Sequence, residues 1–394
     1  MEASGGRRPF YRPRRSAAAA LAGAADVVAL TAERAAFAPP RQPEQPLPPP
    51  TGQPPFRLDL ADVLGAEAVA EIEQRGQLTF HTVGDTGGVK CVDSQEIVTR
   101  WMEHDFDVVD PPPSFFYHLG DVVYFDGERS RYYDQFYDPY LHYAAPIFAI
   151  PGNHDGDLGI PPVGFSLEGF MVNFCSADGA VTPDAKDAPR PAMTQPNCYW
   201  TLLTPLVTIV GLYTNSPEGG VVKPDQAQWF TGELAAAPHD KALVVALHHP
   251  PYSGDDHHSS SLAMRALLKQ AFADSGRRPD LVLAGHVHNY QRWSVPDGDG
   301  GGSLTYLVAG AGGYPNLHSM GSVDGGPPPI PWTDAASGAT LESYNQEQRH
   351  GFLRLTVSRA DINGVYTTVP RPQESWSHGP VKAIDQFSIP LSTV

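Results

Sequence analysis

The stretch that decides the fold is SFFYHLGDVVY, residues Ser114–Tyr124. An apolar run of strand length ends at Gly120 and leads directly into Asp121, which predicts a buried strand followed by a polar loop. Four more stretches have this form: LTFHTVGD (78–85), APIFAIPGNH (145–154), KALVVALHH (241–249) and DLVLAGHVH (280–288). Buried strands that alternate with amphipathic segments predict an α/β fold, in which the polar loops gather at the carboxyl ends of the strands.

The segments around these runs complete the expected layers. Helices are predicted at Asp93–His104, Ser130–Tyr143, Pro224–Ala237 and Ser260–Ser275. Asp93 and Glu96 have the spacing of a capping box, and Pro224 suits a first helical turn. Residues 198–214 predict two strands of a second sheet, interrupted at Pro205, and further strands are predicted at 304–309, 352–358 and 362–368. The Gly- and Pro-rich regions 157–196 and 311–345 are predicted to be loops.

The composition excludes several classes of protein. The chain has 394 residues, a formal net charge of −17, 38 Gly and 40 Pro. A strongly acidic chain has no general affinity for nucleic acid or anionic membranes, so nucleic acid in bulk is not expected as a partner. No apolar run approaches the roughly 18–20 residues of a membrane span. The expected partner is a small molecule, and the composition says nothing about the oligomeric state.

The first 55 residues differ from the rest of the chain. Five arginines occur in the first fifteen positions, an Ala-rich run follows, and nine prolines lie between Pro39 and Pro55. We predict a disordered or targeting segment at 1–55 and one catalytic domain at 56–394. GRRPFYR (6–12) followed by SAAAALAGAA suggests a twin-arginine export signal, whereas a transit peptide or an intracellular tail fits the same composition.

The three cysteines allow at most one disulfide. Cys175 and Cys198 flank a Pro-rich stretch, so a bridge between them would stabilise an insertion in an oxidising compartment. Two unrelated thiols fit equally well, and Cys91 has no evident partner.

The polar clusters that follow the predicted strands are rich in metal ligands. In chain order they read GDTG (84–87), GDVVY (120–124), GNHD (152–155), LHHPPY (247–252) and GHVH (285–288). One of these short motifs alone would be weak evidence, but five in this order at strand ends point to a common site. Carboxylates, an amide oxygen, imidazoles and a phenol suit two borderline-to-hard ions, and a shared carboxylate would place them roughly 3.5 Å apart.

These five blocks resemble the calcineurin-like metallophosphoesterases, and more narrowly the purple acid phosphatases. The likeness covers about residues 79–294 and implies a four-layer α/β/β/α sandwich with a binuclear metal site at the carboxyl-terminal edge of the strands. Ordinary members have a metal-binding His at the position of Gly87. Purple acid phosphatases instead have a Tyr three residues after the second-block Asp, where this chain has Tyr124. A phenolate ligand favours Fe(III), because only a strongly polarising ion removes its proton readily.

The resemblance implies a ligand set for each ion. The Fe(III) site would comprise Asp85, Asp121, Tyr124 and His288. The second site, for Fe, Zn or Mn, would comprise Asp121, Asn153, His248 and His286. Asp121 would bridge the ions, and His248 is preferred to His249 because it lies two residues before Pro250.

Catalysis needs groups beyond the metals, because the phosphoryl group needs donors and the leaving alkoxide needs a proton. By resemblance His154 would face the phosphate, and His257 would lie at the mouth of the site, with His258 as its competitor for the role of general acid. The implied activity is phosphate monoester hydrolysis through attack by a metal-held hydroxide. A phosphodiesterase acting on cyclic nucleotides or phospholipid head groups, or an inactive scaffold of the same fold, would have the same framework.

Overall fold

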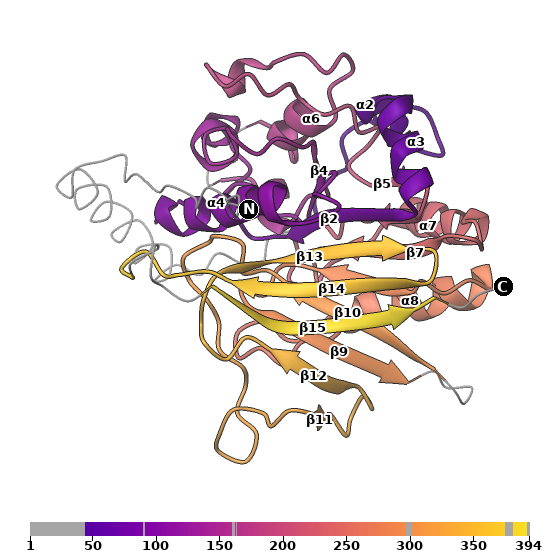
Figure 1. Cartoon of the computed structure of the whole chain (residues 1–394), viewed down its shortest axis with the longest axis vertical. Helices are drawn as coiled ribbons and strands as arrows, with labels where there is room; N and C mark the ends of the chain where they lie inside the picture. Colours follow the sequence, from indigo (N-terminus) through magenta and orange to yellow (C-terminus); the bar gives the residue numbers. More distant parts are fainter. Residues whose placement is uncertain are drawn as a thin grey trace, which may run out of the picture.

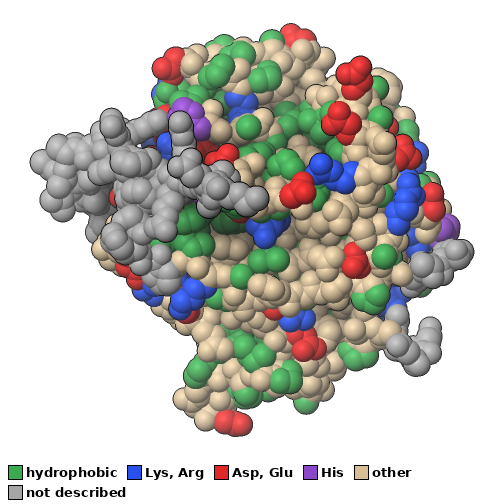
Figure 2. Space-filling view, viewed as in Figure 1, with side chains coloured by type: hydrophobic (Ala, Val, Ile, Leu, Met, Phe, Trp, Pro, Cys, Tyr) green, Lys and Arg blue, Asp and Glu red, His purple; other side chains and the backbone are tan. Residues whose placement is uncertain are grey.

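The computed structural model describes residues 44–89, 91–159, 162, 164–296, 302–374 and 381–391. Two β-sheets pack face to face, and helices cover their outer faces (Figure 1). On the face drawn in Figure 2, acidic and basic side chains are interspersed rather than gathered by sign. No helix within the described ranges is both long enough and apolar enough to span a membrane.

The six-stranded sheet carries the first three polar clusters. Its order is β15-β14-β13-β2-β3-β4. The strands are β2 (Gln77–Val83), β3 (Phe116–His118), β4 (Ile147–Ala149), β13 (Gly351–Ser358), β14 (Asp361–Thr368) and β15 (Lys382–Pro390). β2, β3 and β4 are parallel, so their carboxyl ends meet at one edge, whereas β13 to β15 are antiparallel additions.

The nine-stranded sheet carries the other two clusters. Its order is β1-β5-β6-β7-β8-β10-β9-β12-β11. The strands are β1 (Arg57–Asp59), β5 (Trp200–Leu203), β6 (Val207–Gly211), β7 (Ala242–Leu247), β8 (Leu281–Ala284), β9 (Tyr290–Pro296), β10 (Ser303–Ala309), β11 (Trp332–Thr333) and β12 (Thr340–Tyr344). β6, β7, β8 and β10 form its parallel centre.

The central strands are apolar on both faces because each face is covered. In β7, Val244 and Ala246 point into the core between the sheets, whereas Leu243 and Val245 point to the opposite face. This is the two-residue period of a strand, here with apolar side chains at every position. Burying each large aliphatic side chain contributes about 1.5–3 kcal/mol.

Helices form the two outer layers. α7 (Pro224–Ala236) and α8 (Leu262–Ser275) cover the nine-stranded sheet, and α4 (Val92–Val108) packs on the six-stranded one. The remaining helices are α2 (Ala61–Leu64), α3 (Ala66–Arg75), α5 (Asn153–Gly156) and α6 (Glu168–Phe174), and the single turns are η1 (Arg129–Arg131), η2 (Tyr133–Tyr137) and η3 (Pro183–Ala185). The predicted four-layer α/β/β/α class is confirmed.

Three local predictions are wrong. The regions 157–196 and 311–345 are not loops throughout, because α6 and η3 lie in the first and β11 and β12 in the second. Asp93 cannot begin a capping box, because α4 starts at Val92 with Cys91 at the N-cap and no side-chain hydrogen bond there. The segment 130–143 is not one α-helix but a 3₁₀ turn, a π turn and irregular turns. Its aromatic side chains explain the difference. Five of them, Tyr132, Phe136, Tyr137, Tyr140 and Tyr143, are buried in one cluster, and their packing overrides helical periodicity.

The N-terminal segment and the cysteines were open questions in the sequence. The predicted export signal falls outside the described residues, and the boundary at residue 55 stays a prediction. Residues 44–55 contact the domain: Gln45 N–H donates to Asn215 Oδ1 at 2.8 Å, and Gly52 N–H donates to the Pro196 carbonyl at 2.8 Å. Cys175 and Cys198 are buried free thiols, and burial raises the pKa of Cys198 to about 12.

Candidate metal centre

The carboxyl ends of five strands from both sheets meet at one place. Asp85 follows β2, Asp121 follows β3 and Asn153 follows β4, while His248 and His286 follow β7 and β8. Hydrogen bonds cross between the two sheets here. His286 N–H donates to Asp85 Oδ2 at 2.8 Å, and His248 Nδ1–H donates to the Leu119 carbonyl at 2.8 Å.

Four donor groups converge on one point at the second predicted metal position. Asn153 Oδ1 lies 2.9 Å from His286 Nδ1 and 3.1 Å from His248 Nε2. Asp121 Oδ2 lies 3.4 Å from the same His248 nitrogen. Ligands held about 2.1 Å from one ion lie about 3 Å from each other, so this spacing is that of a coordination sphere.

Three more groups converge at the first predicted position. The Tyr124 hydroxyl lies 3.3 Å from Asp85 Oδ1 and 3.4 Å from His288 Nε2. His288 Nε2 lies 3.6 Å from Asp85 Oδ1. All seven predicted ligands are therefore brought together, although they are spread from residue 85 to residue 288 of the sequence.

Gly87 and Tyr124 occupy complementary space. A Cβ atom at residue 87 would lie 2.8 Å from Tyr124 Cδ2 and would overlap the Gln135 amide oxygen. Gln135 in turn accepts from the Tyr124 backbone N–H at 2.9 Å and donates to the Tyr124 carbonyl at 3.0 Å. The Tyr124 ring therefore lies against the space that a side chain at residue 87 would need.

The two aspartates are buried carboxylates with histidines as their cationic neighbours. Burial raises the pKa of Asp85 to about 7, although the charge of His248 opposes this. Burial would also raise the pKa of Asp121, but the charges of His248 and His154 outweigh it and hold that pKa well below its usual range. Bound cations would satisfy both carboxylates.

Two of the imidazoles are held in the form that binds metals. Burial lowers the pKa of His286 to about 3 and that of His288 well below its usual value, so both rings are neutral at neutral pH. Tyr124 stays protonated without a cation, because burial, Asp121 and Asp85 raise its pKa well above 10. The donor chemistry and burial of the site thus fit a pair of metal ions.

The backbone at the site has an unusual conformation. Asp85, Asp121 and His286 have φ angles of 59°, 54° and 66°, the left-handed region that non-glycine residues rarely adopt. Such positions cluster at functional sites because the surrounding structure holds them in place.

Asp155 holds the loops that carry the ligands. Its carboxylate accepts from Gly152 N–H at 2.8 Å, Val122 N–H at 3.1 Å and Val123 N–H at 3.2 Å. Burial, followed by the charge of Asp121, raises the pKa of Asp155 to about 7. Asp155 joins the loop after β3 to the loop after β4.

The predicted catalytic histidines lie at different distances from the ligands. His154 Nδ1–H donates to the Phe125 carbonyl at 2.8 Å, and the ring centre lies 4.6 Å from that of Tyr124. His257 is 63% exposed and pairs with Asp256 at 2.5 Å. His258 is nearer to the ligands, because its ring centre lies 4.2 Å from that of His286.

Three residues at the site were missed by the sequence analysis. Tyr314 stacks on Tyr124 with ring centres 4.2 Å apart, and His318 lies 4.4 Å from His288. Glu218 contacts His258 and His286. Tyr314 and His318 belong to a Gly- and Pro-rich loop and Glu218 to a turn, so no local pattern marked them.

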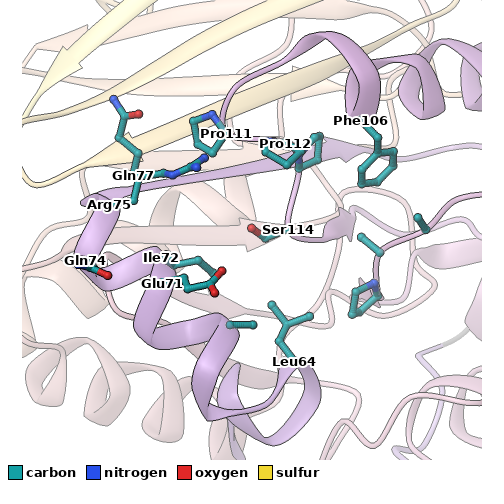
Figure 3. A pocket seen from close by; sticks show the side chains of 15 residues that line it. Leu64, Glu71, Ile72, Gln74, Arg75, Gln77, Phe106, Pro111, Pro112 and Ser114 are labelled. Atoms are coloured by element: carbon teal, nitrogen blue, oxygen red, sulfur yellow. The ribbon is translucent and has the colours of Figure 1, made fainter. Parts of the chain in front are cut away.

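One large hollow lies away from this centre. It has a volume of about 700 Å³ and is lined by α3, α4 and the chain entering β2, β3 and β4, at the amino ends of these strands (Figure 3). Among the described residues that line it, Glu71 and Arg75 are the titratable ones, and neither His nor Cys contributes. This hollow lacks the chemistry of the strand-end site.

The fold and the strand-end ligands define a metal-dependent phosphoesterase architecture. Residues 78–290, more than half of the chain, match the calcineurin-like phosphoesterase family. The chain belongs to this family.

The chain is also similar to curated proteins over part of its length. Over 190 residues the chain is 24% identical to the uncharacterized protein Rv2577 of Mycobacterium tuberculosis strain H37Rv; the match spans 44% of this chain and 33% of the relative. The chain thus spans about a third of the curated relatives it matches.

Two solved structures share the fold. Purple acid phosphatase PPD1 from yellow lupin (Lupinus luteus) seeds has a TM-score of 0.52 at 16% identity, covering 80% of this chain and 54% of that one. GAP50, the anchor in the inner membrane complex of Plasmodium, has a TM-score of 0.54 at 14% identity. The match covers 80% of this chain and 90% of GAP50. At these identities the likeness concerns the fold.

Proposed function

We propose that this protein hydrolyses phosphate monoesters at a binuclear metal centre of the purple acid phosphatase type. The observation that carries the proposal is the pairing of Gly87 with Tyr124, since a phenol occupies the space that a side chain at 87 would need. Tyr124 would then be the ligand that selects Fe(III) at the first position, with Fe, Zn or Mn at the second.

The ligand sets are those that the arrangement of the side chains supports. Asp85, Tyr124 and His288 would hold the first ion, Asn153, His248 and His286 the second, and Asp121 both. When bound, such a pair supplies Lewis-acid activation of water and neutralises charge on the phosphoryl group.

The remaining residues would bind and orient the ester. His154 is fixed through Nδ1, which leaves Nε2 available to a phosphoryl oxygen. His258 would protonate the leaving group, because its ring is held beside His286, whereas the His257 side chain is 63% exposed and its ring stacks on His318. His257 remains the alternative donor, since a loop carrying two adjacent histidines can present either one.

The test is elemental analysis together with the visible absorption spectrum of the purified protein. About two metals per chain including iron, with a broad tyrosinate-to-Fe(III) band that disappears in Tyr124→Phe, would support the proposal. Two divalent ions without colour would leave a metallophosphoesterase of another metal type and would contradict the Fe(III) assignment.

Rates on an aryl monoester and an aryl diester separate the phosphatase from a phosphodiesterase. A higher kcat/KM for the monoester is expected. A preference for the diester would favour the phosphodiesterase, and absence of turnover on both by the metal-loaded protein would favour a scaffold. The complete set of ligands speaks against a scaffold, because binding alone needs no matched Gly87 and Tyr124.

A further inference from the structure

Glu218 lies on a tight turn that is held at both sides. The turn follows β6: Gly220 N–H donates to the Pro217 carbonyl at 2.8 Å, and Val221 N–H donates to the Thr214 carbonyl at 2.8 Å. Gly219 and Gly220 have φ angles of 82° and 76°, which glycine adopts without steric cost. The turn is thereby a rigid platform for the side chain of Glu218.

Contacts with the neighbouring loop fix the turn against the metal centre. The Ser261 hydroxyl at the start of α8 donates to the Gly219 carbonyl. A Cβ atom at Gly220 would lie 3.1 Å from His249 Nδ1, so the turn packs closely beside this buried histidine. His249 precedes the loop that carries His258, and both ends of that loop therefore contact the turn.

One oxygen of Glu218 faces two imidazoles. Oε1 lies 3.1 Å from His258 Nδ1 and 3.5 Å from His286 Nε2. The other nitrogen of His286, Nδ1, lies 2.9 Å from Asn153 Oδ1, on the side of the second metal position. His286 thus has one nitrogen toward the metal ligands and the other toward a carboxylate.

We propose that Glu218 is a positioning residue that orients His286 toward the second metal and holds His258 at the mouth of the site. It accepts a hydrogen bond from His286 Nε2–H, which selects the tautomer with a free Nδ1 lone pair. It also accepts from His258 Nδ1–H, which leaves His258 Nε2 to face the ester. The inference rests on the proposed function, because it assigns a role to a residue of that same site.

The chemistry of ligating histidines supports this role. A carboxylate that accepts from the distal N–H of a ligating imidazole fixes its orientation and increases its basicity, and its loss typically costs 10–100-fold in metal affinity. Among the residues that the structure describes around His286, Glu218 provides a carboxylate in that position. Its side chain is 47% exposed, so its replacement should not disturb the core.

The first experiment measures metal binding without substrate. Zn²⁺ is titrated calorimetrically into metal-free wild type, Glu218→Ala and Glu218→Gln, with Glu73→Gln as the control because Glu73 is an exposed carboxylate on α3. Affinity at the second metal position is expected to fall 10–100-fold in Glu218→Ala and only a few-fold in Glu218→Gln, which retains an acceptor oxygen. The control should bind as wild type does.

The second experiment tests the link to His258. If Glu218 acts through that ring, the loss of kcat caused by Glu218→Ala should be smaller in a His258→Ala background than in wild type. Fully additive losses would overturn this half of the proposal.

The outcomes separate this inference from the proposed function. Wild-type binding of two ions with unchanged Zn²⁺ affinity in Glu218→Ala would overturn the positioning role and leave the function intact. A third ion in wild type that is lost in Glu218→Ala would make Glu218, His258 and His286 ligands themselves, and would also overturn it. Failure of wild type to bind metal would overturn the proposed function.

Discussion

At the scale of single residues, Gly87 shows how one missing side chain shapes the site. Gly87→Ala should push the Tyr124 ring aside, because the new methyl group would lie 2.8 Å from its Cδ2 atom. We expect the tyrosinate band of the iron-loaded protein to weaken and stability to fall by about 1–3 kcal/mol. Gly232→Ala in α7 is the control: nothing lies within 4 Å of its new Cβ atom. An unchanged band in Gly87→Ala would contradict the spatial pairing with Tyr124.

Asp121 is the residue on which both ligand sets depend. Asp121→Asn should retain the fold, because Asn tolerates the φ of 54° found here, and Asp121→Ala should be the less stable of the two. Both variants are expected to lose bound metal and about 10³-fold or more of kcat. Metal content, thermal unfolding and turnover are the measurements, and retained activity in either variant would refute the binuclear site.

His118 is a buried neutral histidine that makes stability depend on pH. Gly120 N–H donates to its Nδ1 at 3.1 Å, and Nε2 lies 2.9 Å from the Thr86 hydroxyl. Burial lowers its pKa to about 3, against about 6.5 in the unfolded chain. Between these values the unfolded chain binds the extra proton. The stability contribution is therefore complete above pH 6.5 and is lost as the pH falls, at about 1.4 kcal/mol per pH unit.

Urea unfolding of the metal-free protein between pH 7 and 4 measures this effect. The free energy of unfolding of wild type should fall more steeply with decreasing pH than that of His118→Gln. The difference between the two slopes should be at most that of one bound proton, about 1.4 kcal/mol per pH unit. Parallel curves for the two proteins would show that His118 is not buried in its neutral form.

At the scale of elements, the start of α8 joins helix stability to the site. Ser261 is its N-cap: the hydroxyl oxygen accepts from Met264 N–H at 3.0 Å, while its proton is donated to Gly219. Ser261→Ala should cost about 1 kcal/mol from the lost cap. It should also raise KM, because the turn that carries Glu218 loses an anchor. Chemical denaturation and steady-state kinetics measure the two effects. A loss of stability without a change in KM would show that Ser261 caps the helix but does not position the turn that carries Glu218.

The elements also show where local patterns succeed. Pro224 begins α7 as expected, and α8 begins at Leu262, within two residues of its predicted start. The buried apolar residues of both helices belong to one cluster against the nine-stranded sheet. The helix prediction for residues 130–143 was wrong because the aromatic side chains of this segment are buried on several sides, and no single periodicity describes such packing.

At the scale of the whole molecule, an ion pair between the partly exposed Arg292 and the buried Asp385 joins the two sheets. Arg292 of β9 donates to both Asp385 oxygens, at 2.7 and 3.1 Å, and the Tyr290 hydroxyl donates to Asp385 at 2.7 Å. Asp385→Ala leaves the partly exposed guanidinium and the Tyr290 hydroxyl without their acceptor and should cost about 1–3 kcal/mol. Arg292→Met combined with Asp385→Leu should recover most of this loss. Equal destabilisation of the single and double variants, measured by thermal unfolding, would contradict this account.

The sequence by itself determined the alternation of buried strands and helices and the polar clusters at the strand ends. Runs such as Ser114–Gly120 specify buried strands because they are mostly apolar, and the ligands follow the carboxyl ends of five such strands. Chain order and spacing alone therefore predicted that Asp85, Asp121 and His286 would lie at one edge.

Only the tertiary structure decided the surroundings of those ligands. The structure shows that His258 lies beside His286. It also brings three residues of distant loops to the site, namely Glu218, Tyr314 and His318. The ion pair between the sheets also depends on the tertiary structure. The periodicity of a strand depends on neighbouring residues, so it can be read from a short stretch of sequence. Contacts between distant loops form only when the two sheets pack, so no local pattern predicts them.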